Sequence, residues 1–488
     1  TRHYGIENPT FADIKSYYDT HLHPDAIDLH DQEVYKNIFH DGKWIGVFQF
    51  TEQGAQRFAQ KVKPRSIIDL SAITSIYRPG PLSAGVDRDF TEAKLQPQYV
   101  EYINDTVREV TEETYGFLIF QEHIALLAHK LGKDLSLDEG NLLRKVLTKK
   151  GTGKGHEVKD RIYNKFVEGC LEKNMTKSQA NQLWKTFEYF SGYGFNKSHA
   201  VSYSIISYQC AWLCNYYNGE WTASFLDREP ETRKEKAINL AKQHGFQIQH
   251  LNINTSGYRW ELLDETTLVA PLTTIKGLGE KAIEQIIANR PFSNAEDLLF
   301  NENIVYSKFN KKAIDVLCRA GAMNDLIDDR FTGDKHFWSV ICVDKPRSKK
   351  KLDEKIELYR PEGSFTEEER IEYLTSLTGM FPFKLVITDD VTRRLGELYI
   401  PPISEFDRDL GVCWIIPRDV TKKKTRNGKP FYVVDVIDTN SVQTRIRCWG
   451  VDPTKDTIHR NRPYMIRPAY SDDWGFSTRG PINKTWKL

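Results

Sequence analysis

One corner of the chain places an arginine directly before a stiff turn. Arg78 precedes Pro79-Gly80-Pro81, in which the prolines fix φ and the glycine lets the backbone approach a ligand closely. The arginine would therefore project from a rigid support, and a fixed guanidinium suits a phosphate group. The alternative is a loop that ends a helix and carries a solvated arginine.

A basic run follows between Asn141 and Gly151. On a helix Arg144, Lys145 and Lys149 occupy one broad face, while leucine and valine pack behind them. Clustered cations repel one another unless an anion lies among them, which suits a triphosphate or a nucleic-acid backbone. An ordinary solvated helix face would have the same composition.

Glycines and aromatic residues precede Asn-Lys-Ser-His in the segment 190–199, FSGYGFNKSH. Asn196 or Ser198 can cap a helix that starts near His199, and helix N-termini attract anions. Lys197 and His199 would complete a phosphate site there. Taken alone, His199 fits a structural role equally well, and the combination favours the phosphate site.

The turn Ile-Lys-Gly-Leu-Gly at 275–279, before EKAIEQIIANR, has the form of a helix-hairpin-helix turn. Lys276, Gly277 and Gly279 would present backbone N–H groups and a cation to a DNA phosphate, independently of base sequence. A weaker copy at 309–326 carries Lys311, Lys312 and Arg319. A plain αα-hairpin with a glycine turn is the competing interpretation.

A strongly basic loop occurs near the end of the chain, between strand-like segments that carry Phe431, Tyr432 and Trp449. Basic loops beside aromatic platforms are how small barrels hold single-stranded nucleic acid, although a solubilising hairpin is also consistent. The candidate residues of the loop are Lys422, Lys423, Lys424, Arg426 and Lys429.

The hydrophobic patterns predict which elements position these residues. A period of 3.6 residues recurs between about 47 and 230, short strands appear around 247–270, and short helices with glycine turns return over 271–325. Residues 326–400 are poorly patterned, and alternation over 408–470 with a turn at Asn427-Gly428 predicts a five-stranded barrel. The fold class is therefore multidomain, mainly α-helical at first and all-β near the end.

Composition limits the class of protein. With 488 residues the chain is long enough for two to four domains, and no apolar run approaches the ~18 residues of a membrane helix. Seven cysteines without C-x-x-C spacing predict a soluble protein of a reducing compartment, without disulfides or a zinc ribbon. Because 68 Lys and Arg nearly cancel 67 Asp and Glu, only the placement of charge can indicate a polyanionic partner.

Six motifs in order closely resemble the bacterial and phage C-family replicative DNA polymerases, the DNA polymerase III alpha subunits, over residues 40–330. The motifs are GVFQFTEQGAQRF (46–58), YRPGPLSAG (77–85), TYGFLIFQEHI (114–124), LLRKVLTKK (142–150), FSGYGFNKSHAVSYSIISYQ (190–209) and IKGLG (275–279). The resemblance implies a DNA-directed DNA polymerase with these parts: the end of a palm (1–46), fingers (47–230), tandem helix-hairpin-helix elements that grip the duplex (231–325), a connector (326–405), an oligonucleotide-binding barrel near the single-stranded template (406–475) and a tail (476–488).

By the same resemblance, seven residues would surround the triphosphate and base of the incoming nucleotide: Arg78, Arg144, Lys145, Lys149, Asn196, Lys197 and His199. Lys145 and Thr148 stand where the family usually has Arg and Gly. The implied cofactor is Mg²⁺, held mainly by palm aspartates and the dNTP. The palm motif P-D-x-D-x-D-F is not found in the sequence, and Asp407-x-Asp409 is its one close mimic.

Two expectations follow from these departures. Since the sequence starts at Thr1 without Met, we expect the palm on a separate polypeptide, or joined by protein splicing, and this chain alone to be inactive. The partners implied are that palm-bearing half, primer–template DNA, dNTP and a sliding clamp, in the cytoplasm of a bacterial cell or phage-infected host. The alternative is a non-catalytic DNA-binding accessory protein or an inactive polymerase paralogue.

Overall fold

The computed structural model describes residues 10–148, 153–343, 345–451, 458–471 and 474–479, and for residues 148, 153–156 and 231 it describes the backbone only. The chain divides into two compact units, Thr1–Asn218 and Gly219–Leu488. Among the described residues, no helix is both long and apolar enough to span a membrane.

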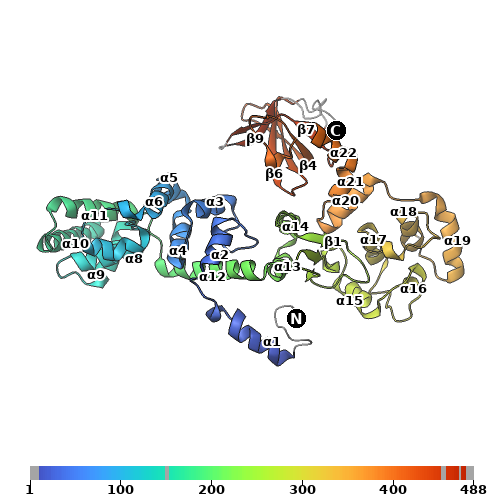
Figure 1. Cartoon of the computed structure of the whole chain (residues 1–488), viewed down its shortest axis with the longest axis horizontal. Coiled ribbons are helices and arrows are strands. Elements are labelled where there is room, and N and C mark those ends of the chain that lie inside the picture. The colour runs from blue at the N-terminus through green and yellow to red at the C-terminus, as the bar shows by residue number, and fades with distance from the viewer. Residues whose placement is uncertain (1–9, 149–152, 344, 452–457, 472–473, 480–488) are drawn as a thin grey trace. The chain divides into compact units, whose positions relative to one another are not determined.

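The first unit is helical, as the sequence predicts. Its helices are α1 (Phe11–Tyr17), α2 (Gln32–Val34), α3 (Gln53–Val62), α4 (Ile67–Ile76), α5 (Pro79–Ser83), α6 (Val86–Leu95), α7 (Asp105–Thr111), α8 (Gln121–Leu131), α9 (Leu137–Thr148), α10 (Gly153–Glu172), α11 (Lys177–Ser191) and α12 (Lys197–Tyr216) (Figure 1). Short π-helical segments η1 (Tyr18–Leu22) and η3 (Tyr35–His40) extend α1 and α2, and the 3-10 turn η5 (Glu112–Thr114) extends α7.

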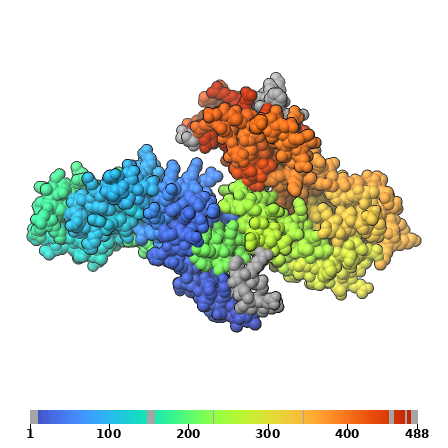
Figure 2. All heavy atoms as spheres, in the orientation of Figure 1, coloured from blue at the N-terminus to red at the C-terminus, as the bar shows by residue number. Residues whose placement is uncertain are grey.

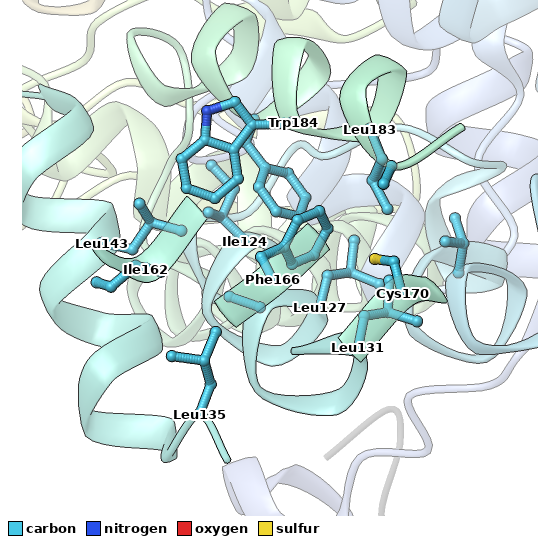
Figure 3. Close-up of a cluster of buried hydrophobic side chains, with 14 of the residues drawn as sticks. Ile124, Leu127, Leu131, Leu135, Leu143, Ile162, Phe166, Cys170, Leu183 and Trp184 are labelled. Atoms are coloured by element: carbon cyan, nitrogen blue, oxygen red, sulfur yellow. The ribbon is translucent and has the colours of Figure 1, made fainter. Parts of the chain in front are cut away.

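Helices α8 to α11 pack together as one lobe of this unit, which Figure 2 shows as a continuous surface. The core of the lobe contains Leu127 and Leu131 from α8, Phe166 from α10 and Trp184 from α11, all at most 5% exposed (Figure 3). Burial also raises the pKa of the Cys170 thiol in this core to about 11. The seven cysteines are all free thiols.

Close backbone contact within the lobe depends on glycine. A Cβ atom on Gly169 of α10 would meet the carbonyl oxygen of Leu131 and the nitrogen of Lys133, both of which are backbone atoms. The connection that leaves α8 can therefore lie directly on α10 only because residue 169 has no side chain.

A buried ion pair joins the elements near the Arg78 corner. Lys94 Nζ of α6 lies 3.0 Å from Asp69 Oδ2 of α4, and both side chains are at most 5% exposed. The hydroxyl of Tyr115 donates to Asp69 Oδ1 at 3.2 Å. The helix that precedes Arg78 is thus tied to the segment that leads into α8.

The second unit begins with α13 (Asn218–Arg228, whose first residue closes the first unit), α14 (Lys234–Gln243) and a three-stranded sheet. Its strands β1 (Gln247–Gln249), β2 (Glu261–Leu262) and β3 (Thr267–Val269) are ordered β1-β3-β2. The 3-10 turn η7 (Leu272–Thr274) and the helices α15 (Glu280–Asn289), α16 (Ala295–Leu299) and α17 (Lys311–Arg319) follow. This alternation of short strands and helices agrees with the pattern of 231–325.

Residues 326–405 contain helices of their own, where the sequence predicts a poorly patterned connector. They are α18 (Asp334–Trp338), α19 (Lys349–Tyr359), α20 (Glu367–Thr378), α21 (Phe383–Val386) and α22 (Asp389–Glu397). Residues of α20 to α22 share an apolar cluster with Trp414, Ile416 and Ile437 of the following sheet. The part of this stretch from α20 to α22 therefore packs as a helical layer against the sheet that contains β4 and β5.

The all-β module is confirmed as a curled six-stranded sheet, a half-barrel consistent with an oligonucleotide-binding fold. Its strands are β4 (Cys413–Lys424), β5 (Pro430–Ile437), β6 (Gln443–Trp449), β7 (Tyr464–Ile466), β8 (Ala469–Ser471) and β9 (Gly475–Arg479), in the order β7-β4-β5-β6-β9-β8. The pairing of β6 with β9 is parallel, and the other pairings are antiparallel.

The sheet has six strands where the sequence predicts five, because β7 and β8 are separated by only Arg467 and Pro468. Proline has no N–H for a ladder hydrogen bond, so the strand breaks there. The two pieces lie at opposite ends of the strand order, and their continuity in the chain makes the sheet curl.

Candidate nucleotide and nucleic-acid binding sites

The loop before α12 is held at the N-terminus of that helix by a cap and a carboxylate. Asn196 is the cap, since its Oδ1 accepts from the backbone N–H of His199 at 2.9 Å. Glu122 of α8 accepts from Asn196 Nδ2 at 3.0 Å and from the backbone N–H of Lys197 at 2.9 Å. Asn196, and not Ser198, therefore starts the helix predicted from the sequence.

Arg78 reaches this loop from the proline corner. Its Nη2 donates to the carbonyl oxygen of Tyr193 at 2.5 Å, and its guanidinium lies 4.7 Å from the centre of the Phe195 ring. A Cβ on Gly80 would lie 3.1 Å from the Tyr193 ring, so the glycine permits the close approach. Burial lowers the pKa of Arg78 from its usual value.

Arg144 is connected to the same loop through Gln121 at the start of α8. Arg144 Nη1 donates to Gln121 Oε1, while Gln121 Nε2 donates to the carbonyl oxygen of Gly194 at 3.0 Å. The backbone N–H of Gln121 also donates to Phe195 at 2.9 Å. Lys145 is exposed on α9, whereas Lys149 lies outside the described residues.

Lys197 is held by an acidic residue that sequence reasoning missed. Its Nζ lies 2.5 Å from Glu113 Oε1, and His123 Nε2 lies 3.2 Å from the same oxygen. The hydrogen bond with His123, followed by those with Lys197, holds the pKa of Glu113 below its usual value against the effect of burial. An incoming phosphate would have to displace Glu113 from Lys197.

Several of the predicted residues therefore meet around one loop. Arg78, Asn196, Lys197 and, through Gln121, Arg144 all contact residues 193–197 or the carboxylates that hold them. The exposed ring of His199 lies 4.1 Å from the Tyr203 ring and 5.5 Å from that of Phe195, measured between centroids. Glu113, Gln121 and Glu122 lie in or beside the motif at 114–124, which is the only sequence signal for them.

The helix-hairpin-helix turn is open at its glycines. Gly277 adopts φ of +90°, and α15 begins directly after Gly279, beside which a Cβ would meet no atom within 4 Å. The methylene carbon next to the amine of Lys312 lies 3.4 Å from the place where a Cβ on Gly277 would be. Lys276 is exposed, so two lysines flank this turn.

In the weaker copy of the turn, residues 309–326, two of the three cationic side chains contact other parts of the chain. Arg319 is paired with Asp315, and its guanidinium lies 5.0 Å from the centre of the Tyr373 ring. Lys311 donates to the carbonyl oxygen of Val343 at 3.2 Å. These contacts direct Arg319 and Lys311 to neighbouring segments. Lys312, by contrast, lies beside Gly277 in the turn 275–279.

The curled sheet aligns cations and aromatic rings in one row of cross-strand partners. Lys423, Phe431, Trp449 and Arg479 are paired in register across β4, β5, β6 and β9. The rings of Phe431 and Trp449 stack with centroids 4.5 Å apart and planes 24° apart. Tyr432 points to the other face and is only 2% exposed, so it belongs to the core.

The basic loop beside this row is a tight hairpin. Thr425 N–H donates to the carbonyl oxygen of Lys429 at 2.9 Å, and Gly428 adopts φ of +75°, as the Asn-Gly turn predicts. The five candidate residues are all exposed: Lys422, Lys423, Lys424, Arg426 and Lys429.

Within the described ranges, no group of three or more His, Cys, Asp or Glu residues is arranged to hold a metal ion.

Comparison with known proteins finds two families along the chain. Residues 8–174 match the bacterial DNA polymerase III alpha subunit finger domain, and residues 245–332 match a helix-hairpin-helix motif. The finger match begins well before residue 47, where the sequence pattern places the start of the fingers.

Several DNA polymerase III alpha subunits are similar over most of the chain. The subunit of Aquifex aeolicus is 28% identical over 452 residues, which are 91% of this chain and 38% of that protein. The subunit of Caulobacter vibrioides is 33% identical over 306 residues, which are 62% of this chain and 26% of that protein. The chain thus spans between about a quarter and two fifths of these relatives. Over most of its length it is similar to bacterial DNA polymerase III alpha subunits, with the finger-domain match over residues 8–174 and the helix-hairpin-helix match over residues 245–332.

Proposed function

We propose that this chain is the nucleotide- and DNA-binding part of a C-family replicative DNA polymerase. The incoming dNTP binds at the loop before α12, duplex DNA at the turn 275–279, and the single-stranded template on the row from Lys423 to Arg479. The palm is supplied by a preceding segment or a separate chain. The observation that carries the proposal is that Arg78, Arg144 and Lys197 meet around residues 193–197.

The chemical role of the cluster follows from charge. A triphosphate carries several negative charges, and fixed guanidinium and ammonium groups neutralise them as the primer 3′-hydroxyl attacks the α-phosphate. Arg78 is already anchored by Ser75 and Tyr193, so little side-chain entropy is lost when it binds. Lys197 first has to exchange Glu113 for the phosphate.

The proposed partners are the palm-bearing half, primer–template DNA, dNTP and, from the family resemblance alone, a sliding clamp. One feature of the first unit supports a partner at α1. No residue of α1 is buried, and the side chain of Phe11 is 82% exposed. Ile14 and Tyr18, three and seven residues further along, are also exposed, and a group of neighbouring exposed apolar side chains is expected at a surface that another segment covers.

The proposal is tested by dNTP binding in the assembled polymerase. Arg78→Ala and Lys197→Ala should each weaken dNTP affinity by about tenfold, since each removes a charge-assisted contact. Lys185→Ala, which removes an exposed lysine from α11, is the matched control. Unchanged dNTP affinity in both test variants would contradict the assignment.

A second candidate function is a non-catalytic DNA-binding protein, which would also carry the helix-hairpin-helix motif matched at residues 245–332. Primer extension with Mg²⁺ and dNTPs, with and without a palm-bearing partner, separates the two. Extension that depends on both polypeptides supports the polymerase. DNA binding without extension in the presence of that partner supports the accessory protein.

A further inference from the structure

A cavity of about 590 Å³ lies between α20 and the curled sheet of the second unit, apart from the sites described above. Helix α20 contributes Thr375, β4 contributes Arg418, and the segment before β7 contributes His459, Arg460 and Arg462. The cavity is large enough for a small polar ligand.

Arg418 is the most buried charge of this cavity. Its side chain is 15% exposed, and its guanidinium lies 4.1 Å from the centre of the Phe381 ring. Nη1 donates to Asn461 Oδ1 at 2.8 Å, and the nearest carboxylate oxygen, Glu235 Oε1, is 3.5 Å from Nη2. This long ion pair compensates a buried charge only weakly, and burial lowers the pKa of Arg418.

Two polar atoms of the cavity residues have no hydrogen-bond partner. Arg418 Nε and Thr375 Oγ1 are both inaccessible to solvent and unpaired. Buried polar groups in proteins are nearly always hydrogen-bonded, so each unpaired one calls for a ligand, an ion or a water molecule. The two atoms come from different elements that line the same cavity, which points to one shared occupant.

The charges around the cavity indicate the chemistry of the occupant. Arg460 is paired with Asp419 at 2.5 Å and Arg462 with Glu368 at 2.9 Å, and all four side chains are at least half exposed. Exposed pairs contribute little to stability, so these arginines can exchange their partners at low cost. Guanidinium groups match the oxygens of phosphate in geometry and charge.

We propose that this cavity binds a phosphate group. Small side-chain rotations bring Arg418 Nε and the Thr375 hydroxyl, which are covered in the free chain, to the cavity surface to donate hydrogen bonds to it, while Arg460 and Arg462 turn from their carboxylates towards it. The phosphate comes either from free pyrophosphate or from the backbone of a nucleic-acid strand. The proposal does not depend on nucleotide binding before α12.

The test is calorimetric titration of the full chain with pyrophosphate and, separately, with oligothymidylate that has no terminal phosphate. Arg418→Met keeps an unbranched side chain against Phe381 and should weaken phosphate binding by about tenfold. Thr375→Val is isosteric and should weaken it by about threefold. Arg393→Met, an exposed arginine of α22 paired with Asp390, is the matched control and should bind as the unaltered chain does.

The unfolding midpoint of each variant shows that the fold is retained, and the conservative Thr375→Val keeps the test valid if Arg418→Met does not fold. The same titration of Lys197→Ala shows how much of the anion binding depends on the loop before α12. If the Arg418 and Thr375 variants bind only pyrophosphate more weakly, the natural occupant of the cavity is a free anion. If they bind both ligands more weakly, the occupant is the backbone of a nucleic-acid strand. If Thr375→Val and any folded Arg418 variant bind both ligands as tightly as the control, the cavity holds only water and the proposal is overturned.

Discussion

At the scale of single residues, the proposed nucleotide cluster, defined as Arg78, Arg144 and Lys197 around residues 193–197, combines cations with carboxylates that restrain them. Glu113 and Glu122 bind Lys197 and the loop before it, so the free site is neutralised internally. A cation held by an exchangeable carboxylate favours ligands with enough charge to displace it. Glu113 is therefore expected to select for the triphosphate over weaker anions.

Glu113→Gln should strengthen dNTP binding by about two- to fivefold, because a partly exposed ion pair contributes roughly 0.5–1 kcal/mol. Equilibrium titration at constant salt measures the change, and Glu109→Gln is the control, since Glu109 pairs with Lys130 elsewhere in the unit. Weaker binding in Glu113→Gln would show instead that Glu113 positions Lys197.

The pKa of Glu113 sets a pH dependence for the same contact. Since His123 and Lys197 hold this pKa below the usual 4.5, the ion pair stabilises the fold fully above that value. Its contribution is lost as the pH falls through the lowered folded-state pKa and the carboxyl is protonated. Glu113→Gln should therefore lower the free energy of unfolding at neutral pH, where the ion pair is fully formed, and reduce the further loss of stability below pH 4.5, as measured by chemical unfolding at several pH values.

At the scale of elements, the packing of the lobe of α8 to α11 depends on close contact between α10 and the backbone of the segment that follows α8. Gly169→Ala places a methyl group against Leu131 and Lys133 and should destabilise the first unit by about 1–3 kcal/mol. Gly192→Ala is the control, because a Cβ there meets no atom within 4 Å. Chemical unfolding of both variants measures the difference, and equal midpoints would contradict the packing described.

The row from Lys423 to Arg479 across the curled sheet is the proposed site for a single strand, and this can be tested separately. Trp449→Ala should weaken oligothymidylate binding by about 1–3 kcal/mol, since a base loses its stacking surface. Tyr99→Ala removes an aromatic ring that is 74% exposed in the first unit and should have no effect. Fluorescence anisotropy with a labelled strand measures both, and equal affinities would exclude this row as the strand site.

The sequence predicts elements well where buried residues recur often. Helix α19 shows the limit: only Leu352 and Ile356 are buried along its length, so its periodic signal consists of two residues. Register is another limit, because Phe431 and Tyr432 are equally aromatic in sequence while only Phe431 lies on the outer row.

Site residues are predictable when their chemistry is visible in one segment. Arg78 and Lys197 can be proposed as site residues from their proline and glycine neighbours. Glu113 and Glu122 cannot be proposed in this way, since their partners in the loop before α12 are more than seventy positions away and glutamate at a helix start has an ordinary structural explanation.

At the scale of the whole molecule, a net charge of +1 provides no general attraction for DNA. Any DNA binding must then come from local contacts between cationic side chains and phosphates. Each such contact adds to the dependence of DNA affinity on salt concentration. Replacing Lys423 and Arg426 by Gln should lower the slope of log affinity against log salt by about 0.7 for each lost contact with a single strand. Replacing Lys349 and Lys351, exposed lysines of α19, should leave the slope unchanged.

Helix α12 starts at the nucleotide cluster and runs for 20 residues, which is about 30 Å. Along it, the hydroxyl of the fully buried Tyr208 donates to the carbonyl oxygen of Asp28 at 2.9 Å, and Tyr216 at its end donates to Asp31 at 2.5 Å. The helix is thus anchored by hydrogen bonds at its middle and at its C-terminal end. A change in the packing of Tyr208 would therefore shift the start of the helix, so a substitution far from the loop before α12 can alter the position of Lys197.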